Sequence, residues 1–127
     1  MSKYIQKNIV VFGLGKSGKS ILKYFYKKKI NVICWDESLF IRKKIKKEFP
    51  KNKIVNFKHI DWKKIDTLIA SPGISLNNPL LNKAYQNKIK IIRDLEIFSN
   101  NVNNNKVIAV TGTNGKSTTV SLINKMV

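Results

Sequence analysis

Acidic residues are scarce in this sequence. Only seven of its 127 residues are Asp or Glu, against 25 Lys and Arg, which gives a formal net charge of +18. Such a charge suggests an acidic partner such as nucleic acid. Arginine is nearly absent too, since 23 of the basic residues are Lys. Nucleic-acid sites depend on the fork and the stacking of Arg, and Lys shares A/T-rich codons with the abundant Asn and Ile. We therefore predict a solvated Lys surface and no nucleic-acid partner, with a basic nucleic-acid-binding module as an alternative.

Cysteine and long apolar runs are also missing. Cys34 is the single cysteine, so the chain forms no internal disulfide and nothing indicates an oxidising compartment. No stretch approaches the roughly 20 apolar residues of a membrane span, and the N-terminus has no secretory pattern. These absences exclude a disulfide-stabilised secreted domain and membrane insertion. They predict a cytoplasmic protein, which we expect to be a monomer.

Short β-rich runs alternate with helical runs along the first hundred residues. Apolar residues recur at helical spacing in Ile21, Leu22 and Phe25, whereas segment 8–12 is almost continuously apolar. Strands are predicted at 8–12, 30–35, 53–57, 66–70 and 88–92, and helices at 17–29, 39–49, 78–87 and 94–99. This alternation predicts an α/β fold with a parallel sheet, a Rossmann-like domain over residues 1–99.

The remaining residues suggest the start of a second domain. Residues 100–105, Asn-Asn-Val-Asn-Asn-Asn, are polar and indicate a linker. A strand is predicted at 106–110 and a helix from residue 115 onward. One strand and one helix cannot bury a core alone. We therefore expect 106–127 to be the truncated first β-loop-α unit of a P-loop ATPase domain, and the chain to be a fragment of a longer protein.

The first motif is a glycine loop, Gly13-Leu-Gly-Lys-Ser-Gly18, between a predicted strand and a predicted helix. Glycines allow a tight turn and close approach of a phosphate, and the helix N-terminus offers N–H groups and a positive dipole end. Asp36 ends the second strand, where an acid reaches a ribose or base in dinucleotide-binding folds. The pattern predicts a nucleotide site, and an NAD(P)-binding oxidoreductase domain is one interpretation. Glycines used only for packing, with Asp36 capping a turn, are the structural alternative.

The second motif is Thr111-Gly-Thr-Asn-Gly-Lys-Ser-Thr118. Its Gly-Lys-Ser core matches a P-loop, in which Lys116 would bind the β and γ phosphates of ATP and Ser117 would bind Mg²⁺. The first glycine of a full Walker loop would stand at Val110, and here the preceding glycine is Gly112. The sequence thus predicts a variant ATP loop. A dehydrogenase would have no need for this second loop.

With these motifs the chain resembles the N-terminal part of the Mur ligases over its whole length, and within them the D-glutamate-adding branch. The glycine loop at 13–18 resembles the first signature of that branch. Segments 70–74, Ala-Ser-Pro-Gly-Ile, and 94–98, Asp-Leu-Glu-Ile-Phe, resemble the next two, and 110–118 resembles the ATP loop of the family. Folylpolyglutamate synthases carry a similar ATP loop but lack the preceding Rossmann-like domain. Another Mur ligase, such as the L-alanine-adding one, remains an alternative.

The resemblance implies a site in each part of the chain. In these ligases the first domain holds the UDP of a sugar nucleotide. Carried over by position, the UDP-binding residues are Gly15, Lys16, Ser17, Asp36, Glu37, Ser71, Pro72 and Gly73. The ATP-binding residues are Gly112, Thr113, Asn114, Gly115, Lys116, Ser117 and Thr118, with Lys116 catalytic and Ser117 a ligand of Mg²⁺.

The resemblance also implies a reaction, the ATP-dependent addition of D-glutamate to UDP-N-acetylmuramoyl-L-alanine in peptidoglycan precursor synthesis. The γ-phosphoryl group of ATP would activate the L-alanine carboxylate as an acyl phosphate, which the amine of D-glutamate would attack. The carbamylated lysine and the carboxylate-binding positions of the family fall beyond Val127. We therefore expect these 127 residues to be inactive alone.

Overall fold

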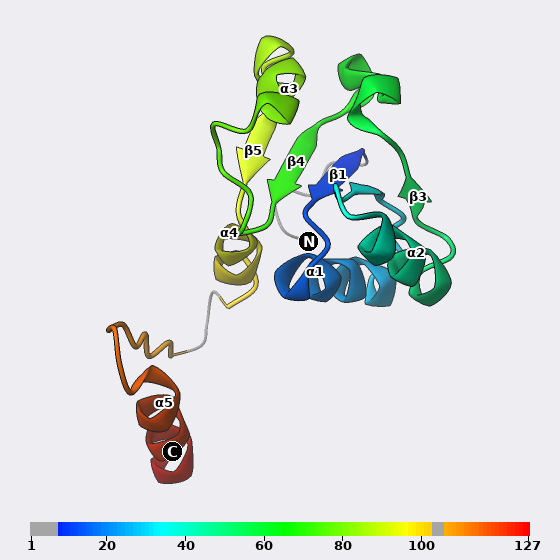
Figure 1. Cartoon of the computed structure of the whole chain (residues 1–127). Helices are drawn as coiled ribbons and strands as arrows, with labels where there is room; N and C mark the ends of the chain where they lie inside the picture. The colour runs from blue at the N-terminus through cyan, green and yellow to red at the C-terminus, as the bar shows by residue number, and fades with distance from the viewer. Residues whose placement is uncertain (1–7, 103–105) are drawn as a thin grey trace.

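The computed structural model describes residues 8–102 and 106–127, and its first part is built around one parallel sheet (Figure 1). The strands lie in the order β3-β2-β1-β4-β5, and each neighbouring pair is parallel. They are β1 (Ile9–Phe12), β2 (Ile33–Trp35), β3 (Lys53–Ile54), β4 (Thr67–Ala70) and β5 (Lys90–Ile92). The helices around them are α1 (Lys16–Lys27), α2 (Leu39–Glu48), η1 (Phe57–His59), η2 (Trp62–Lys64), η3 (Pro79–Leu81), α3 (Asn82–Gln86) and α4 (Asp94–Ser99). The predicted Rossmann-like α/β sheet is confirmed.

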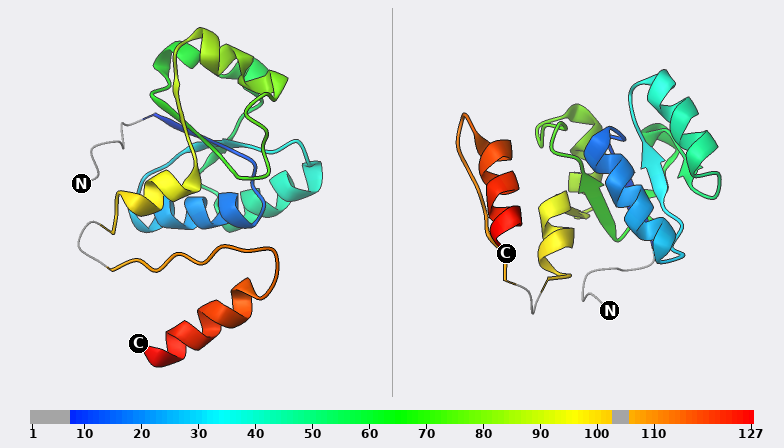
Figure 2. Two further views of the ribbon diagram at one scale, coloured as in Figure 1. Left: turned by 90° about the vertical axis from the view of Figure 1, so that its left-hand side faces the viewer. Right: turned by 90° about the horizontal axis from the view of Figure 1, so that it is seen from below.

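Strand β1 shows why the sheet is covered on both faces. Its four residues, Ile-Val-Val-Phe, are all buried, and successive side chains point to opposite faces. Ile9 and Val11 pack in a core cluster with side chains of α1, α2 and α4. Val10 and Phe12 pack in a second cluster with η1, η2 and α3. Figure 2 shows the resulting layers, with α1, α2 and α4 on one side of the sheet and α3 on the other.

Several predicted elements are shorter in the structure than in the sequence pattern. The strand predicted at 30–35 begins at Ile33, the strand predicted at 53–57 ends at Ile54, and the helix predicted at 78–87 begins as the 3-10 turn η3. The start of that helix is as predicted, because the Asn78 side chain accepts a hydrogen bond from Leu80 N at 2.9 Å. The sequence pattern does not predict η1 and η2, since single 3-10 turns leave no recurring apolar spacing.

The second part corrects one prediction. Residues 106–110 form no strand, and Val107 and Ile108 are more than half exposed. A strand needs a neighbouring strand for its N–H and C=O groups, and the described residues place none beside this segment. Helix α5 (Lys116–Met126) does form, without a buried residue. The predicted β-loop-α unit is therefore a loop followed by a helix.

The predicted linker at 100–105 lies partly outside the described residues, which omit 103–105. Its described part, 100–102, follows the end of α4 at Ser99.

One salt bridge joins α1 to α2. Lys19 Nζ lies 2.6 Å from Glu48 Oε2 and 2.9 Å from Glu48 Oε1. The hydrogen bond from Lys19 holds the pKa of the Glu48 carboxyl below its ordinary value of 4.5. A carboxyl group with a lowered pKa in the folded state adds stability above its unfolded pKa and loses it as the pH falls through the folded pKa.

The variant Glu48→Gln is therefore expected to melt slightly below the wild type at neutral pH and together with it at acid pH. Thermal melts monitored by circular dichroism at both pH values, at low salt, would measure this difference. Glu37→Gln is the matched control, because Glu37 is exposed and its carboxylate makes no ion pair among the described residues. An equal difference at both pH values would show that the salt bridge is not its source.

Candidate functional site

The carboxyl ends of β1, β2 and β4 surround an open cleft of about 340 Å³. Chain order reverses here, because β1 has β2 on one side and β4 on the other. In open parallel sheets, ligands bind outside the carboxyl ends of the strands at such a switch point. The cleft is lined by Gly13, Gly15, Lys16, Ser17, Asp36, Ile41, Ser71, Pro72, Gly73 and Ile74.

A larger hollow, of about 570 Å³, lies at the other end of α1. It is lined by Tyr26, Lys27, Lys29, Ile30, Asn31 and Lys51. A helix C-terminus presents carbonyl oxygens and a negative dipole end, which the nearby lysines offset. The hollow thus lies at the end of the helix that presents carbonyl oxygens, not at the end that presents free N–H groups. Size alone does not make it the better candidate.

The three glycines of the loop at 13–18 have different functions. Gly13 has φ +85°, in the left-handed region that favours glycine. Gly15 is the N-cap of α1, and no atom lies within 4 Å of the position a Cβ would take. At Gly18 a Cβ would lie 1.9 Å from Gly13 O. The first glycine makes the turn, the second leaves the cleft open, and the third lets α1 pack against the end of β1.

The start of α1 supplies anion-binding groups to the cleft. Lys19 N donates to Gly15 O at 2.9 Å, which is the first hydrogen bond of the helix. The N–H groups of the preceding residues, including Lys16 and Ser17, have no helical acceptor. Together with the positive end of the helix dipole they can bind a phosphate.

Asp36 fastens the glycine loop to the end of β2. Its Oδ2 accepts a hydrogen bond from Leu14 N at 2.7 Å, and its Oδ1 accepts one from Ser38 N at 2.8 Å. Leu14 is 3% exposed, so its N–H needs this partner. An ionised carboxylate accepts about four hydrogen bonds. Asp36 can therefore hold the loop and still accept a hydrogen bond from a ligand in the cleft.

The loop 71–74 forms the opposite wall and is bonded directly to the glycine loop. Ser71 is buried, and its hydroxyl donates to Gly13 O at 2.6 Å. Ile74 N donates back to Ser71 O at 2.9 Å, which closes a turn over Pro72 and Gly73. A Cβ on Gly13 would lie 2.8 Å from Ile74 Cγ1. The two walls are therefore packed on each other at the base of the cleft.

Both arginines of the chain bind backbone carbonyl oxygens of the cleft walls. Arg42 Nη1 donates to Asp36 O at 2.6 Å and to Glu37 O at 2.9 Å, and its guanidinium stacks 4.3 Å from the centre of the Trp35 ring. Arg93 Nη1 donates to Ser71 O at 2.6 Å and to Ile74 O at 2.9 Å. One arginine thus holds each wall.

The loop before α5 turns at two glycines with positive φ. Gly112 and Gly115 have φ +152° and +73°, and no atom lies within 4 Å of a Cβ built on Gly115. The N–H and hydroxyl groups of Thr119 both donate to Gly115 O at 3.0 Å, so the N–H groups before Thr119 lack helical acceptors. Gly112, Thr113, Asn114, Gly115, Lys116, Ser117 and Thr118 are all exposed. An open glycine turn at the start of an 11-residue helix fits a phosphate group.

Comparison with known proteins identifies the family. A family model described as Mur ligase MurD-like, N-terminal domain, matches residues 7–93. The chain belongs to the Mur ligase MurD-like family. The UDP-N-acetylmuramoylalanine--D-glutamate ligase of Rickettsia bellii (strain RML369-C) is 37% identical over 123 residues, which cover 97% of this chain and 27% of that protein.

A second MurD-like relative gives the same result. The ligase of the same name from Buchnera aphidicola subsp. Schizaphis graminum (strain Sg) is 40% identical over 129 residues, covering 97% of this chain and 28% of that protein. The chain thus spans about a quarter of the length of these relatives. Among solved structures, shikimate dehydrogenase from Aquifex aeolicus matches with a TM-score of 0.54 and 16% identity, covering 75% of this chain and 45% of that one. This likeness shows the fold alone.

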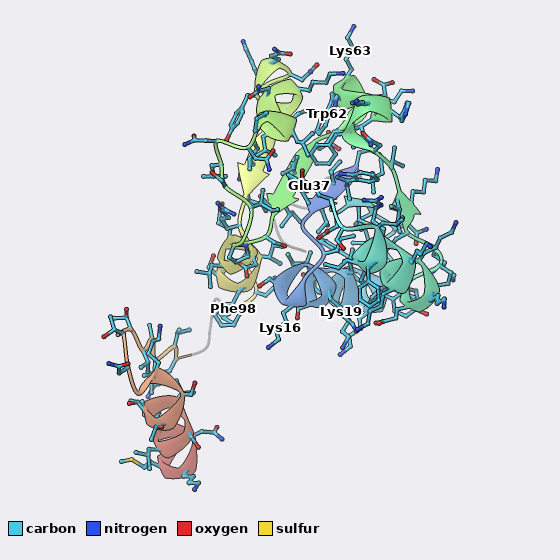
Figure 3. All side chains as sticks on the ribbon, viewed as in Figure 1. Lys16, Lys19, Glu37, Trp62, Lys63 and Phe98 are labelled. Carbon is cyan, nitrogen blue, oxygen red and sulfur yellow. The ribbon has the colours of Figure 1, made fainter. Side chains whose placement is uncertain are left out.

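The MurD-like domain brings together most of the residues that the resemblance assigns to UDP. Gly15, Lys16, Ser17, Asp36, Ser71, Pro72 and Gly73 line the cleft. Glu37, the eighth predicted residue, does not line it; Glu37 is exposed, and Arg42 binds its carbonyl oxygen. The side chain of Lys16 projects from α1 away from the sheet (Figure 3). The fold therefore fixes the backbone N–H of Lys16 and leaves its ammonium in solvent.

Sequence reasoning missed Ile41, Arg42 and Arg93 in this MurD-like domain. Ile41 lines the cleft from the first turn of α2, and an isolated Ile gives no signal in a sequence so rich in Ile. The two arginines did give one. They stand alone among 23 lysines, which points to positions where Lys cannot replace the guanidinium.

Other reactive groups of the MurD-like chain are remote from the cleft or inert. Cys34 is buried, and burial raises the pKa of its thiol to about 12, so it is protonated at neutral pH. Within residues 8–102 and 106–127 there is no group of three or more His, Cys, Asp and Glu side chains arranged to hold a metal ion. Over the same residues no helix has the length and apolar character to cross a membrane.

Proposed function

We propose that this chain is the UDP-sugar-binding domain and the ATP phosphate loop of a D-glutamate-adding ligase of peptidoglycan precursor synthesis. The observation that carries the proposal is the cleft. It gathers seven residues, from three separate loops, that the family resemblance had assigned to UDP. Relatives 37% and 40% identical over 97% of the chain bear the name of that ligase. The same names favour this branch over an L-alanine-adding enzyme and over an NAD(P)-dependent oxidoreductase.

In the proposed complex the diphosphate of UDP-N-acetylmuramoyl-L-alanine binds the N–H groups at the start of α1, with Lys16 and Ser17 beside it. Asp36 and Ile41 face the nucleoside, and the turn over Pro72 and Gly73 closes the opposite side. The helix N-terminus neutralises the diphosphate without a side-chain rearrangement. The domain therefore holds one substrate by its nucleotide end.

The loop at 112–118 is proposed to bind the other substrate, ATP. The open turn at Gly115 admits the phosphates, Lys116 neutralises the β and γ groups, and the Ser117 hydroxyl is placed to bind Mg²⁺ together with phosphate oxygens. ATP supplies the phosphoryl group that makes a carboxylate a competent electrophile. Residues 106–127 would then begin an ATPase domain, residues 1–99 would form the UDP-sugar domain, and 100–105 would link them. A cytoplasmic location and a monomeric state remain predictions.

The proposal can be tested by calorimetry with the 127-residue chain. UDP-N-acetylmuramoyl-L-alanine and UDP are expected to bind, and NADH is not. The variant Gly15→Asp is expected to weaken the binding of UDP at least ~10-fold, because its carboxylate would stand beside the diphosphate. It should not lower the melting temperature, because the site of the new side chain is open and Asp is a good N-cap.

Gly15→Asn is the matched control, since it fills the same space without a charge; it should bind UDP more tightly than Gly15→Asp does. Binding of NADH with no binding of UDP or of the UDP-sugar would overturn the proposed function. If Gly15→Asp and the wild type bound UDP equally well, the nucleotide would have to bind outside this cleft.

A further inference from the structure

We infer that Arg93 is a positioning residue of the nucleotide cleft: its guanidinium holds the loop 71–74 in the shape that binds the UDP-sugar. This inference rests on the proposed function. Arg93 follows β5 and precedes α4, so it belongs to none of the three loops that line the cleft. It acts through the carbonyl oxygens of the wall.

The contacts of Arg93 all fall on one loop. Its Nη1 donates at 2.6 Å to Ser71 O, at 2.9 Å to Ile74 O, and at the longer distance of 3.4 Å to Ala70 O. Nη1 carries two hydrogens, so the two short hydrogen bonds use both of them. These bonds join the two ends of the turn over Pro72 and Gly73. Without them, the carbonyl oxygens of Ser71 and Ile74 would lack their charged donor.

The loop 71–74, which Arg93 holds, is in turn bonded to and packed against the glycine loop. The same Ser71 whose carbonyl binds Arg93 donates its hydroxyl to Gly13 O at 2.6 Å. Ile74, the other residue held by Arg93, packs against Gly13. A displacement of the turn would therefore disturb the glycine loop and the start of α1. Arg93 sets the spacing between the two sides of the cleft.

Lysine is not expected to replace Arg93. Its side chain is one atom shorter, and its ammonium is a strongly hydrated point charge rather than a planar fork. The composition agrees: in a chain with 23 Lys, Arg stands only here and at Arg42, which binds the carbonyl oxygens of the other wall. In both walls a guanidinium thus donates hydrogen bonds to backbone carbonyl oxygens.

The test compares Arg93→Ala, Arg93→Lys and the wild type by calorimetry with UDP-N-acetylmuramoyl-L-alanine, well below the melting temperature of each. Arg93→Ala is expected to raise Kd roughly tenfold, because a displaced wall misplaces groups that bind the ligand. Arg93→Lys is expected to raise it roughly threefold. Lys63→Ala is the control for lost charge, since Lys63 is exposed and projects from the end of the sheet opposite to Lys16, which begins α1 beside the cleft (Figure 3).

Two further readouts separate positioning from general stability. Millimolar guanidinium chloride, compared with the same concentration of sodium chloride, should restore much of the affinity of Arg93→Ala. Amide NMR shifts should change at Gly13, Gly73 and Ile74 in both Arg93 variants and not in Lys63→Ala. Arg93→Lys gives this answer even if Arg93→Ala does not fold.

The outcomes are distinguishable. A wild type that binds neither UDP nor the UDP-sugar would overturn the proposed function itself. If the wild type binds the UDP-sugar, and a folded Arg93→Lys or Arg93→Ala variant binds it with a Kd within twofold of the wild type, Arg93 does not position the cleft. The proposed function would still stand in that case.

Discussion

Replacing Gly18 with alanine is expected to lower the free energy of unfolding by about 3 kcal/mol, at the upper end of the range for overpacking. The added Cβ would lie 1.9 Å from Gly13 O and 2.8 Å from Gly13 C. Both atoms belong to backbone that is fixed by further hydrogen bonds, since Gly13 N donates to Trp35 O and Gly13 O accepts from Ser71. The clash therefore cannot be relieved by turning a side chain. It has to push α1 away from the end of β1.

Loss of nucleotide binding should accompany this loss of stability. The N–H groups at the start of α1 line the cleft together with the loop 71–74. A shift of α1 would separate them from that wall. Urea unfolding followed by circular dichroism gives the first quantity, and calorimetry with UDP on the folded fraction gives the second.

Gly15→Ala is the matched control for Gly18→Ala. It makes the same chemical change three residues earlier, where no atom lies within 4 Å of the new Cβ. Its free energy of unfolding should stay within about 0.5 kcal/mol of the wild type. If the two variants were equally stable, the close packing of Gly18 on Gly13 would not be the reason for glycine at this position.

The glycine loop was predictable because its spacing has one physical cause at each position. A strand that ends in a turn, a helix that begins at once and an acid at the end of the next strand together specify a nucleotide cleft at the sheet edge. The alternation of β and α fixed the parallel sheet in the same way. Seven of the eight residues assigned to UDP accordingly lie around one cleft.

Contacts made by backbone carbonyl groups were not predictable. Arg93 reaches the loop 71–74 across about 20 residues of sequence, and its acceptors are main-chain oxygens that no residue type announces. Arg42 is a similar case with the carbonyl oxygens of Asp36 and Glu37. Only the rarity of arginine marked these positions. It identifies where a guanidinium is needed without saying what it binds.

The predicted strand at 106–110 failed for a different reason. Its apolar, β-rich sequence favours an extended backbone. A strand also requires a neighbouring strand with which its N–H and C=O groups can form hydrogen bonds. The described residues offer none there. Helix α5 needs no such partner, because its hydrogen bonds are internal, and it forms where the sequence predicted it.

Asp36→Ala is the second variant with a large expected effect, and it decides between the two interpretations of this acid. The sequence allowed Asp36 to bind the nucleoside or to cap a turn. In the structure it already accepts hydrogen bonds from Leu14 N and Ser38 N, and it lines the cleft. Asp36 thus has the structural function, and we propose that it also binds the nucleoside.

Removing the carboxylate should lower the free energy of unfolding by about 2 kcal/mol, because the buried N–H of Leu14 loses its charged acceptor. Asp61→Ala is the control; Asp61 is exposed and forms an exposed ion pair with Lys64, three residues further along the chain, so its loss should cost below about 0.5 kcal/mol. Urea unfolding of both variants measures the difference. If Asp36→Ala and Asp61→Ala were equally stable, the hydrogen bond from Leu14 N to Asp36 would not be what holds the glycine loop.

Affinity for UDP separates the two functions of Asp36, because Asp36→Asn keeps one acceptor oxygen and the size of the side chain. If the amide oxygen holds Leu14 N, the glycine loop keeps its shape, and the variant loses the acceptor of Ser38 N and the negative charge offered to the ligand. UDP should then bind several-fold more weakly to Asp36→Asn than to the wild type, while the amide NMR shifts of Leu14 and Gly13 stay close to those of the wild type. Wild-type affinity with an undisturbed loop would leave Asp36 with a structural function alone, and the nucleoside would then be bound by the other residues of the cleft.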